Sequence, residues 1–114
     1  MRWAGRQAVV ALPAHVDESS AGQIRVELLS VIDRGATALI ADMTATISCD
    51  HAGADAVVRA FRRAVIKGTE LRLVVTALAV SRGLSISGID RLVPVYSSLK
   101  AASAASGRHG EVVR

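Results

Sequence analysis

The chain has 114 residues, which is enough for one domain to bury its own core without disulfides or metals. Apolar residues make up 51% of it but aromatic residues only 3%, which argues against a surface that stacks single-stranded nucleic acid. The formal net charge is +4, but the basic residues are scattered apart from one group whose spacing predicts a solvated helix end rather than a phosphate-binding patch: Arg59, Arg62, Arg63 and Lys67.

The first third of the chain predicts a strand, a helix and a second strand. Residues 7–12 form a short apolar run, which is typical of a strand buried on both faces. A helix is predicted over about 19–33, because apolar residues recur on one face, and either Asp17 or Ser19 can cap its start. Residues 38–43 repeat the apolar run and predict another buried strand.

The rest of the chain continues the same alternation. The second predicted helix ends at Gly68 and has the clearest helical periodicity, carried on one face by Val57, Ala60, Phe61, Ala64 and Val65. The elements after it are predicted as a buried strand, a short helix, a brief strand and a last helix, at residues 71–76, 79–87, 93–96 and 97–105.

Alternation of strands and helices indicates parallel strands joined by right-handed crossovers. We therefore expect an α/β fold of layered type, with a small, mostly parallel sheet of four to five strands and about four helices. One domain should span residues 1–114, with a core over about 8–102 and flexible ends at 1–6 and 106–114. In such a sheet the functional loops follow the carboxyl ends of the strands, here after Leu12, Met43 and Thr76.

The sequence offers little for catalysis or metal binding. It contains no glycine-rich phosphate motif, and its histidines, His15, His51 and His109, lack ligand spacing on a helix. Cys49 stands next to Asp50 and His51, but adjacent side chains point in divergent directions, so Cys49 is interpreted as a small apolar residue. We expect no catalytic residues, no metal and no cofactor.

Cellular location is predicted from two further features. Cys49 is the only cysteine, so no internal disulfide can form and a reducing cytoplasm is expected. No segment approaches the roughly 20 uninterrupted apolar residues of a membrane span, and residues 1–6 lack the apolar run of a signal peptide. We expect a cytoplasmic protein without a membrane segment or a nucleic-acid partner.

The most unusual segment, residues 42–55, leads from a buried strand into the second predicted helix and carries several hydroxyl and acidic side chains. A loop that enters a helix presents unpaired N–H groups and the positive end of the helix dipole, which suit an anion or a carboxylate of a partner. Simple capping of the helix by Asp50 is the alternative interpretation.

This segment resembles the signature of STAS domains, the family that includes bacterial anti-sigma factor antagonists. In that family a strand ends in Asp, an apolar residue and Ser or Thr, and Asp-Ser-x-Gly later opens the second helix. The matching residues here are Asp42, Met43, Thr44, Asp50, His51, Ala52 and Gly53. Asp17 and residues 88–96 also fit the family, and the resemblance covers about residues 8–102.

The resemblance implies a transcription regulator that acts by protein–protein binding. Its partner would be an anti-sigma factor of the ATP-dependent serine kinase type, bound through the loop and the start of the second helix. In the family's antagonists that kinase phosphorylates the Ser after the conserved Asp, and the added charge breaks the complex. The implied partner-binding residues are Asp17, Thr44, Asp50, His51, Ala52, Gly53, Asp55 and Arg59.

His51 occupies the position of that phosphorylated Ser, so the ordinary switch cannot operate there. Asp55 also replaces a usual Gly, and Ser48 stands where a bulky apolar residue is common, so we expect an altered docking surface. Either the switch is lost, or phosphorylation has moved to Thr44, Thr46 or Ser48. A third interpretation makes His51 itself a proton-sensitive or phosphoryl-accepting switch, although a helix N-terminus disfavours its cationic form.

A function of another class is also compatible with the resemblance. STAS domains occur in sulfate transporters and lipid-transport systems, which implies an accessory module that binds a transporter subunit or a small ligand such as a nucleotide or lipid. The sequence also leaves a homodimer open.

Overall fold

The computed structural model describes residues 1–105, so His109 and the expected flexible tail at 106–114 lie outside the described residues. Its strands are β1 (Arg2–Ala4), β2 (Gln7–Ala11), β3 (His15–Val16), β4 (Ala38–Met43), β5 (Ser48–Cys49), β6 (Glu70–Val75) and β7 (Val95–Tyr96). Its helices are α1 (Glu18–Asp33), α2 (His51–Lys67), α3 (Leu78–Ser87), α4 (Leu99–Ala104) and a short 3-10 turn, η1 (Ile89–Arg91).

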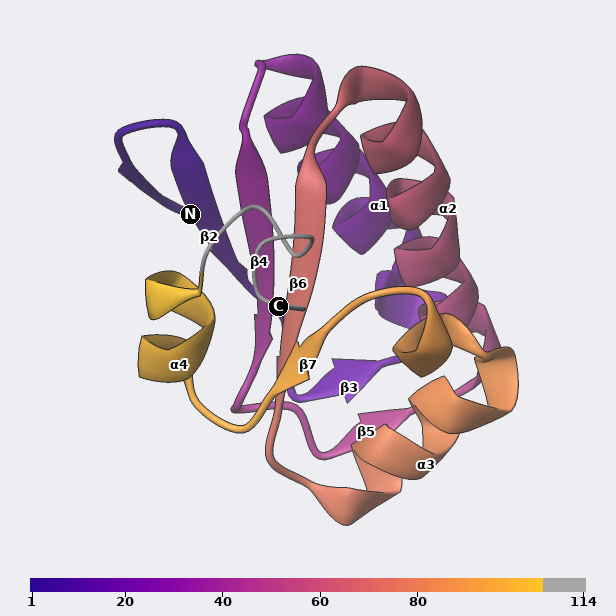
Figure 1. The fold of residues 1–114 in the computed structure, drawn as a ribbon. Helices are drawn as coiled ribbons and strands as arrows, with labels where there is room; N and C mark the ends of the chain where they lie inside the picture. Colours follow the sequence, from indigo (N-terminus) through magenta and orange to yellow (C-terminus); the bar gives the residue numbers. More distant parts are fainter. Residues whose placement is uncertain (106–114) are drawn as a thin grey trace.

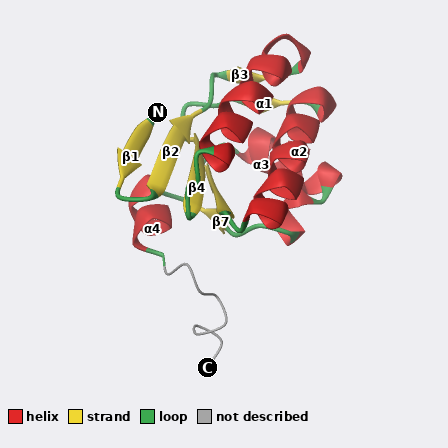
Figure 2. Ribbon diagram, turned by 90° about the horizontal axis from the view of Figure 1, so that it is seen from above, coloured by secondary structure: helices red, strands yellow, loops and turns green. Residues whose placement is uncertain are grey.

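The main sheet has five strands in the order β1-β2-β4-β6-β7. The last four of these run parallel to one another, and β1 pairs antiparallel at the edge. Helices α1 and α2 cover one face of the sheet and α4 covers part of the other (Figures 1 and 2). The predicted α/β class, the mostly parallel sheet and the four helices are confirmed.

Three strands were not predicted. Residues 2–4 form β1 instead of the expected flexible start, because a turn at Gly5, with a left-handed φ of 63°, folds them back onto β2. The strands β3 and β5 pair with each other in a separate two-stranded sheet. Segments of two or three residues carry no measurable periodicity of their own, so only the pairing partner reveals them.

The larger core lies between the sheet and helices α1 and α2. Alternate residues of β2, β4 and β6 point into it, and many of its members are small, which lets the helices approach the sheet closely. Val65, which the sequence pattern puts on one face of the helix with Val57, is 62% exposed. Eight residues along a helix amount to a turn of about 80° past the starting direction, which carries Val65 off the buried stripe.

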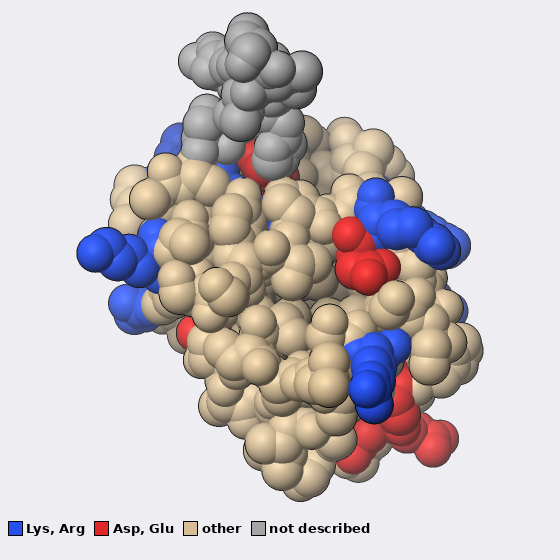
Figure 3. Space-filling view, turned by 60° about the horizontal axis from the view of Figure 1, so that its bottom comes forward, with Lys and Arg blue, Asp and Glu red and all other residues tan. Residues whose placement is uncertain are grey.

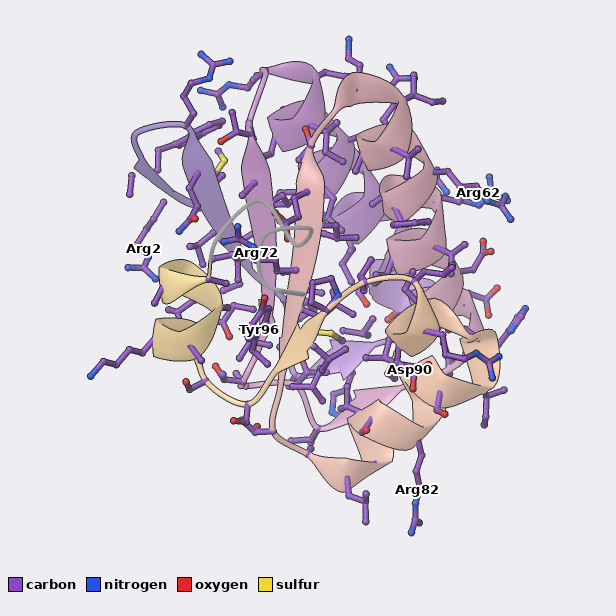
Figure 4. All side chains as sticks on the ribbon, in the orientation of Figure 1. Arg2, Arg62, Arg72, Arg82, Asp90 and Tyr96 are labelled. Atoms are coloured by element: carbon purple, nitrogen blue, oxygen red, sulfur yellow. The ribbon has the colours of Figure 1, made fainter. Side chains whose placement is uncertain are left out.

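The other face of the sheet has a smaller core under α4, formed around Ile40, Val74 and Ala102. Arg72 of β6 lies on this face and is only 2% exposed (Figure 4). Its guanidinium donates hydrogen bonds to the Gln7 side chain (3.1 Å), the Ala102 carbonyl oxygen (3.0 Å) and the Glu70 carboxylate (3.2 Å). These bonds tie α4 to the sheet. Because α4 is short, β2 stays half exposed on this face, whereas β4 and β6 are buried as predicted.

Candidate functional site

The loop between β4 and β5 lies at the carboxyl end of the main sheet, as expected for functional loops of a parallel sheet (Figure 1). Hydrogen bonds hold it at several points. The Asp42 carboxylate accepts from the backbone N–H of Thr44 (3.0 Å), and the Thr44 carbonyl accepts from the Thr76 hydroxyl (3.2 Å). The backbone N–H of Ile47 donates to the Ala14 carbonyl (2.8 Å).

The small sheet of β3 and β5 continues from this loop into α2. His15 pairs with Ser48 and Val16 with Cys49. The side chains of the first pair also meet, with 2.7 Å between His15 Nδ1 and Ser48 Oγ. The backbone N–H of Asp50 then donates to the Val16 carbonyl (3.1 Å), so hydrogen bonding between the two segments extends to the residue that caps α2.

Asp50 caps α2, because its carboxylate accepts a hydrogen bond from the backbone N–H of Gly53 (2.9 Å). Gly53 itself is needed at this point of the helix. A Cβ atom there would lie 2.1 Å from the carbonyl oxygen of Val16, closer than real Cβ contacts come. The first turn of α2 therefore packs directly on the backbone of β3.

A second close approach fixes α3 in the same way. A Cβ atom on Gly83 would lie 2.4 Å from the carbonyl oxygen of Cys49, so α3 lies against the backbone of β5. The start of α2 is consequently held between β3, β5 and α3. These contacts fix the position of the first turn of α2, and with it the place of the exposed side chains on that turn.

Most of the predicted partner-binding residues gather around this junction. Asp50 and His51 are exposed and Ala52 is half-buried. Asp55 and Arg59 follow on the next turns of α2 and pair with each other at 2.8 Å. Thr44 is exposed where the loop leaves β4. Gly53, also predicted to bind a partner, is buried. Its role is to let the first turn of α2 pack on the backbone of β3.

Asp17 belongs to the same surface although it is distant in sequence. It caps α1 and lines one shallow hollow together with Glu18, Ser19 and Asp50. Its carboxylate accepts hydrogen bonds from the Ser19 hydroxyl (2.6 Å) and the Ser19 backbone N–H (2.9 Å). The Ser19 hydroxyl is the main cause that lowers the pKa of Asp17, with a smaller contribution from the charge of His15. The hollow is therefore acidic at neutral pH.

One predicted modification site does not fit the structure. Thr46 was named with Thr44 and Ser48 as an alternative phosphorylation site, but it is fully buried. Its hydroxyl donates to the carbonyl oxygen of Pro13 (2.8 Å). Thr46 thus anchors the loop to the end of β2, and a kinase cannot reach its hydroxyl unless the loop opens.

Cys49 has the environment of an inert thiol. Burial, and to a lesser degree the nearby charge of Asp50, raises its pKa to about 11. A thiol with so high a pKa stays protonated near neutral pH and is a poor nucleophile. The interpretation of Cys49 as a small apolar residue fits this environment.

Sequence reasoning missed the contribution of α3 to this surface. Ile86 is 85% exposed and borders a cleft of about 160 Å³ between α3 and the start of α2. Figure 3 shows that this end of the molecule is mostly uncharged, although Arg82 projects outward from α3 there (Figure 4). No sequence pattern marked Ile86, because its exposure depends on how α3 packs against β5.

Within residues 1–105, no group of three or more His, Cys, Asp or Glu side chains is placed to hold a metal ion. None of the helices described is both long and apolar enough to cross a lipid bilayer.

Comparisons with known proteins agree on the fold. The solved anti-sigma factor antagonist from Mycobacterium paratuberculosis is 19% identical, with a TM-score of 0.80 over 89% of this chain and 86% of that one. A putative anti-sigma factor antagonist from Thermotoga maritima is 20% identical, with a TM-score of 0.76 over 99% of this chain and 92% of that one.

The antagonist SpoIIAA in its unphosphorylated form is also 20% identical, with a TM-score of 0.73 over 89% of this chain and 90% of that one. A search of curated proteins found no significant match. The family model of the STAS domain matches residues 4–102, nearly the whole described fold. The chain therefore belongs to the STAS domain family.

Proposed function

We propose that this protein regulates bacterial transcription by binding an anti-sigma factor of the ATP-dependent serine kinase type. The family and the antagonists of similar fold support the proposal. The observation that carries it is the exposed start of α2, seated on β3 through Gly53. The docking surface consists of Asp17, Thr44, Asp50, His51, Ala52, Asp55 and Arg59, with Ile86 of α3 beside them.

The chemistry of this surface indicates what a partner must present. Asp17 and Asp50 share an acidic hollow, which favours basic side chains opposite them. The cleft next to Ile86 is bordered by Asp50 and His51 on one side and by Ala54 and Ile86 on the other, and its apolar part suits an aliphatic side chain of the partner. A partner segment with a basic residue next to an aliphatic one would satisfy both features.

His51 removes the ordinary phosphorylation switch in this proposal. It is the first residue of α2 and is exposed, so a kinase bound at the docking surface meets an imidazole where the family has a hydroxyl. At this position the unmodified, binding-competent state is therefore permanent.

The test compares two substitutions that add the same negative charge at the two ends of α2. His51→Glu places the charge in the docking surface, whereas Ile66→Glu places it on a residue that is 78% exposed near the other end of the helix. An unpaired carboxylate buried in an interface costs about 2 kcal/mol or more, so His51→Glu should weaken binding about 30-fold. Ile66→Glu should leave it unchanged.

Binding of each full-length variant to purified ATPase-type anti-sigma factors is measured by calorimetry. A carboxylate in the first turn of a helix stabilises it, so His51→Glu should melt no lower than the wild type and unfolding cannot explain its loss of binding. Equal binding by both variants would contradict the proposed surface. Capture of a transporter subunit alone, or saturable nucleotide binding without a protein partner, would favour the accessory-module function instead.

A further inference from the structure

The loop between β4 and β5, together with β5 itself, carries three hydroxyl side chains. Only one of them lies beside a side chain that can act as a base. Thr46 is buried and donates to Pro13. Thr44 is exposed, but within residues 1–105 its hydroxyl has no side-chain hydrogen-bond partner. Ser48 is half-buried, and its Oγ atom lies 2.7 Å from Nδ1 of His15.

Strand pairing holds this hydroxyl and this imidazole together. His15 and Ser48 are register partners in the β3–β5 sheet, so their backbones are fixed relative to each other. When the imidazole carries its proton on Nε2, Nδ1 accepts the hydrogen bond from the Ser48 hydroxyl. A hydroxyl that donates to a neutral imidazole is the usual arrangement of an activated serine nucleophile.

A carboxylate stands next to the imidazole. Asp17 follows His15 by two residues, and the charge of His15 contributes to the lowered pKa of Asp17. The carboxylate and the imidazole therefore lie at the same end of strand β3.

Another hydroxyl of the same surface offers a comparison. Ser19 donates to the Asp17 carboxylate at 2.6 Å, so it too lies beside a proton acceptor. That carboxylate has a pKa below its ordinary value and is a weak base, and it also caps α1. Histidine is the side chain most often used as a general base, which favours the imidazole held 2.7 Å from Ser48.

We propose that Ser48 is the phosphoryl acceptor of the docking surface and that His15 is the base that takes its proton. The proposal rests on the proposed function, because the phosphoryl donor is ATP bound by the kinase partner. Oγ of Ser48 forms a bond to the γ-phosphorus as the bond to the β,γ-bridging oxygen breaks. ADP leaves with that electron pair, and the hydroxyl proton moves to Nδ1 of His15 and then to water.

The modification would act on binding through charge. Asp17 and Asp50 directly follow the paired residues of β3 and β5 and line one hollow. Phosphorylation of Ser48 adds about 1.5 to 2 negative charges next to these carboxylates. Desolvation and changed charge at the interface then release the partner, so Ser48 takes over the switch that His51 cannot perform.

The first experiment incubates the full chain with a purified ATPase-type anti-sigma factor and radiolabelled ATP, and maps the phosphate by mass spectrometry. Label is expected on Ser48 and should disappear in Ser48→Ala. His15→Gln should slow labelling about 10-fold or more, since general bases contribute at least that much. Ser30→Ala, which removes an exposed hydroxyl of α1 outside the docking surface, should label at the wild-type rate. Phosphate on Thr44 or Ser19 would overturn the proposal.

Binding is measured separately with a non-hydrolysable ATP analogue. Binding without any label on Ser48 overturns this proposal and leaves the proposed function standing. Absence of binding contradicts the proposed function. A reagent that needs no partner then tests whether the Ser48 hydroxyl is activated by His15.

That reagent is a fluorophosphonate, in which attack by Oγ forms the O–P bond and expels fluoride. Ser48 should react before the other hydroxyls, and His15→Gln should slow it about 10-fold or more, with circular dichroism confirming the fold. Reaction elsewhere, or equal rates in the two proteins, would overturn the assignment.

Discussion

Gly53→Ala gives the sharpest test of how the docking surface is held. The added Cβ would lie 2.1 Å from the Val16 carbonyl oxygen, whereas real Cβ contacts stay beyond 3.0 Å. The start of α2 or strand β3 must therefore move by about 1 Å, and overpacking of this kind typically costs about 1–3 kcal/mol. Alanine is the better helix former by about 1 kcal/mol, which offsets part of the cost.

We expect a net destabilisation of up to about 2 kcal/mol, which corresponds to a Tm lower by up to about 8 °C in a domain of this size. Gly22→Ala is the matched control, because Gly22 lies in α1 with nothing within 4 Å of the added Cβ. Without a clash only the helix propensity changes, so Gly22→Ala should raise Tm by about 4 °C. Thermal unfolding followed by circular dichroism measures both, and a Tm increase in Gly53→Ala would refute the close approach of α2 to β3.

Two further predictions concern charges outside the docking surface. Arg72→Ala removes the ion pair of Arg72 with Glu70 and the donor to Ala102, so urea unfolding should show a loss of about 3–5 kcal/mol. The double variant Arg72→Met, Glu70→Gln removes both charges and should recover most of that loss. If it does not, the loss in Arg72→Ala does not come from separating the charge of Glu70 from that of Arg72. The hydrogen bond from Arg63 lowers the pKa of Asp33 below 3.8, so this group contributes stability above that pH and loses it as pH falls through the lowered pKa. The urea midpoint of Asp33→Asn should therefore fall less than that of the wild type between about pH 6 and about pH 3, and equal falls would contradict the pairing.

Local sequence patterns determined the larger elements of this protein. Strands β2, β4 and β6 and helices α1 and α2 lie within one or two residues of their predicted bounds, because apolar runs and helical periodicity are properties of neighbouring residues. The cap at Asp50 and the left-handed end of α2 at Gly68 are equally local. The family signature also depends on short spacing, and it led to the correct fold.

Only the tertiary structure decided how the docking surface is assembled. The two-residue strands β3 and β5 exist because they pair with each other, and that pairing places His15 beside Ser48 and Asp17 near Asp50. The burial of Thr46 likewise depends on Pro13. These features rest on contacts between segments distant in sequence, and the free energy of such contacts leaves no trace in a local sequence pattern.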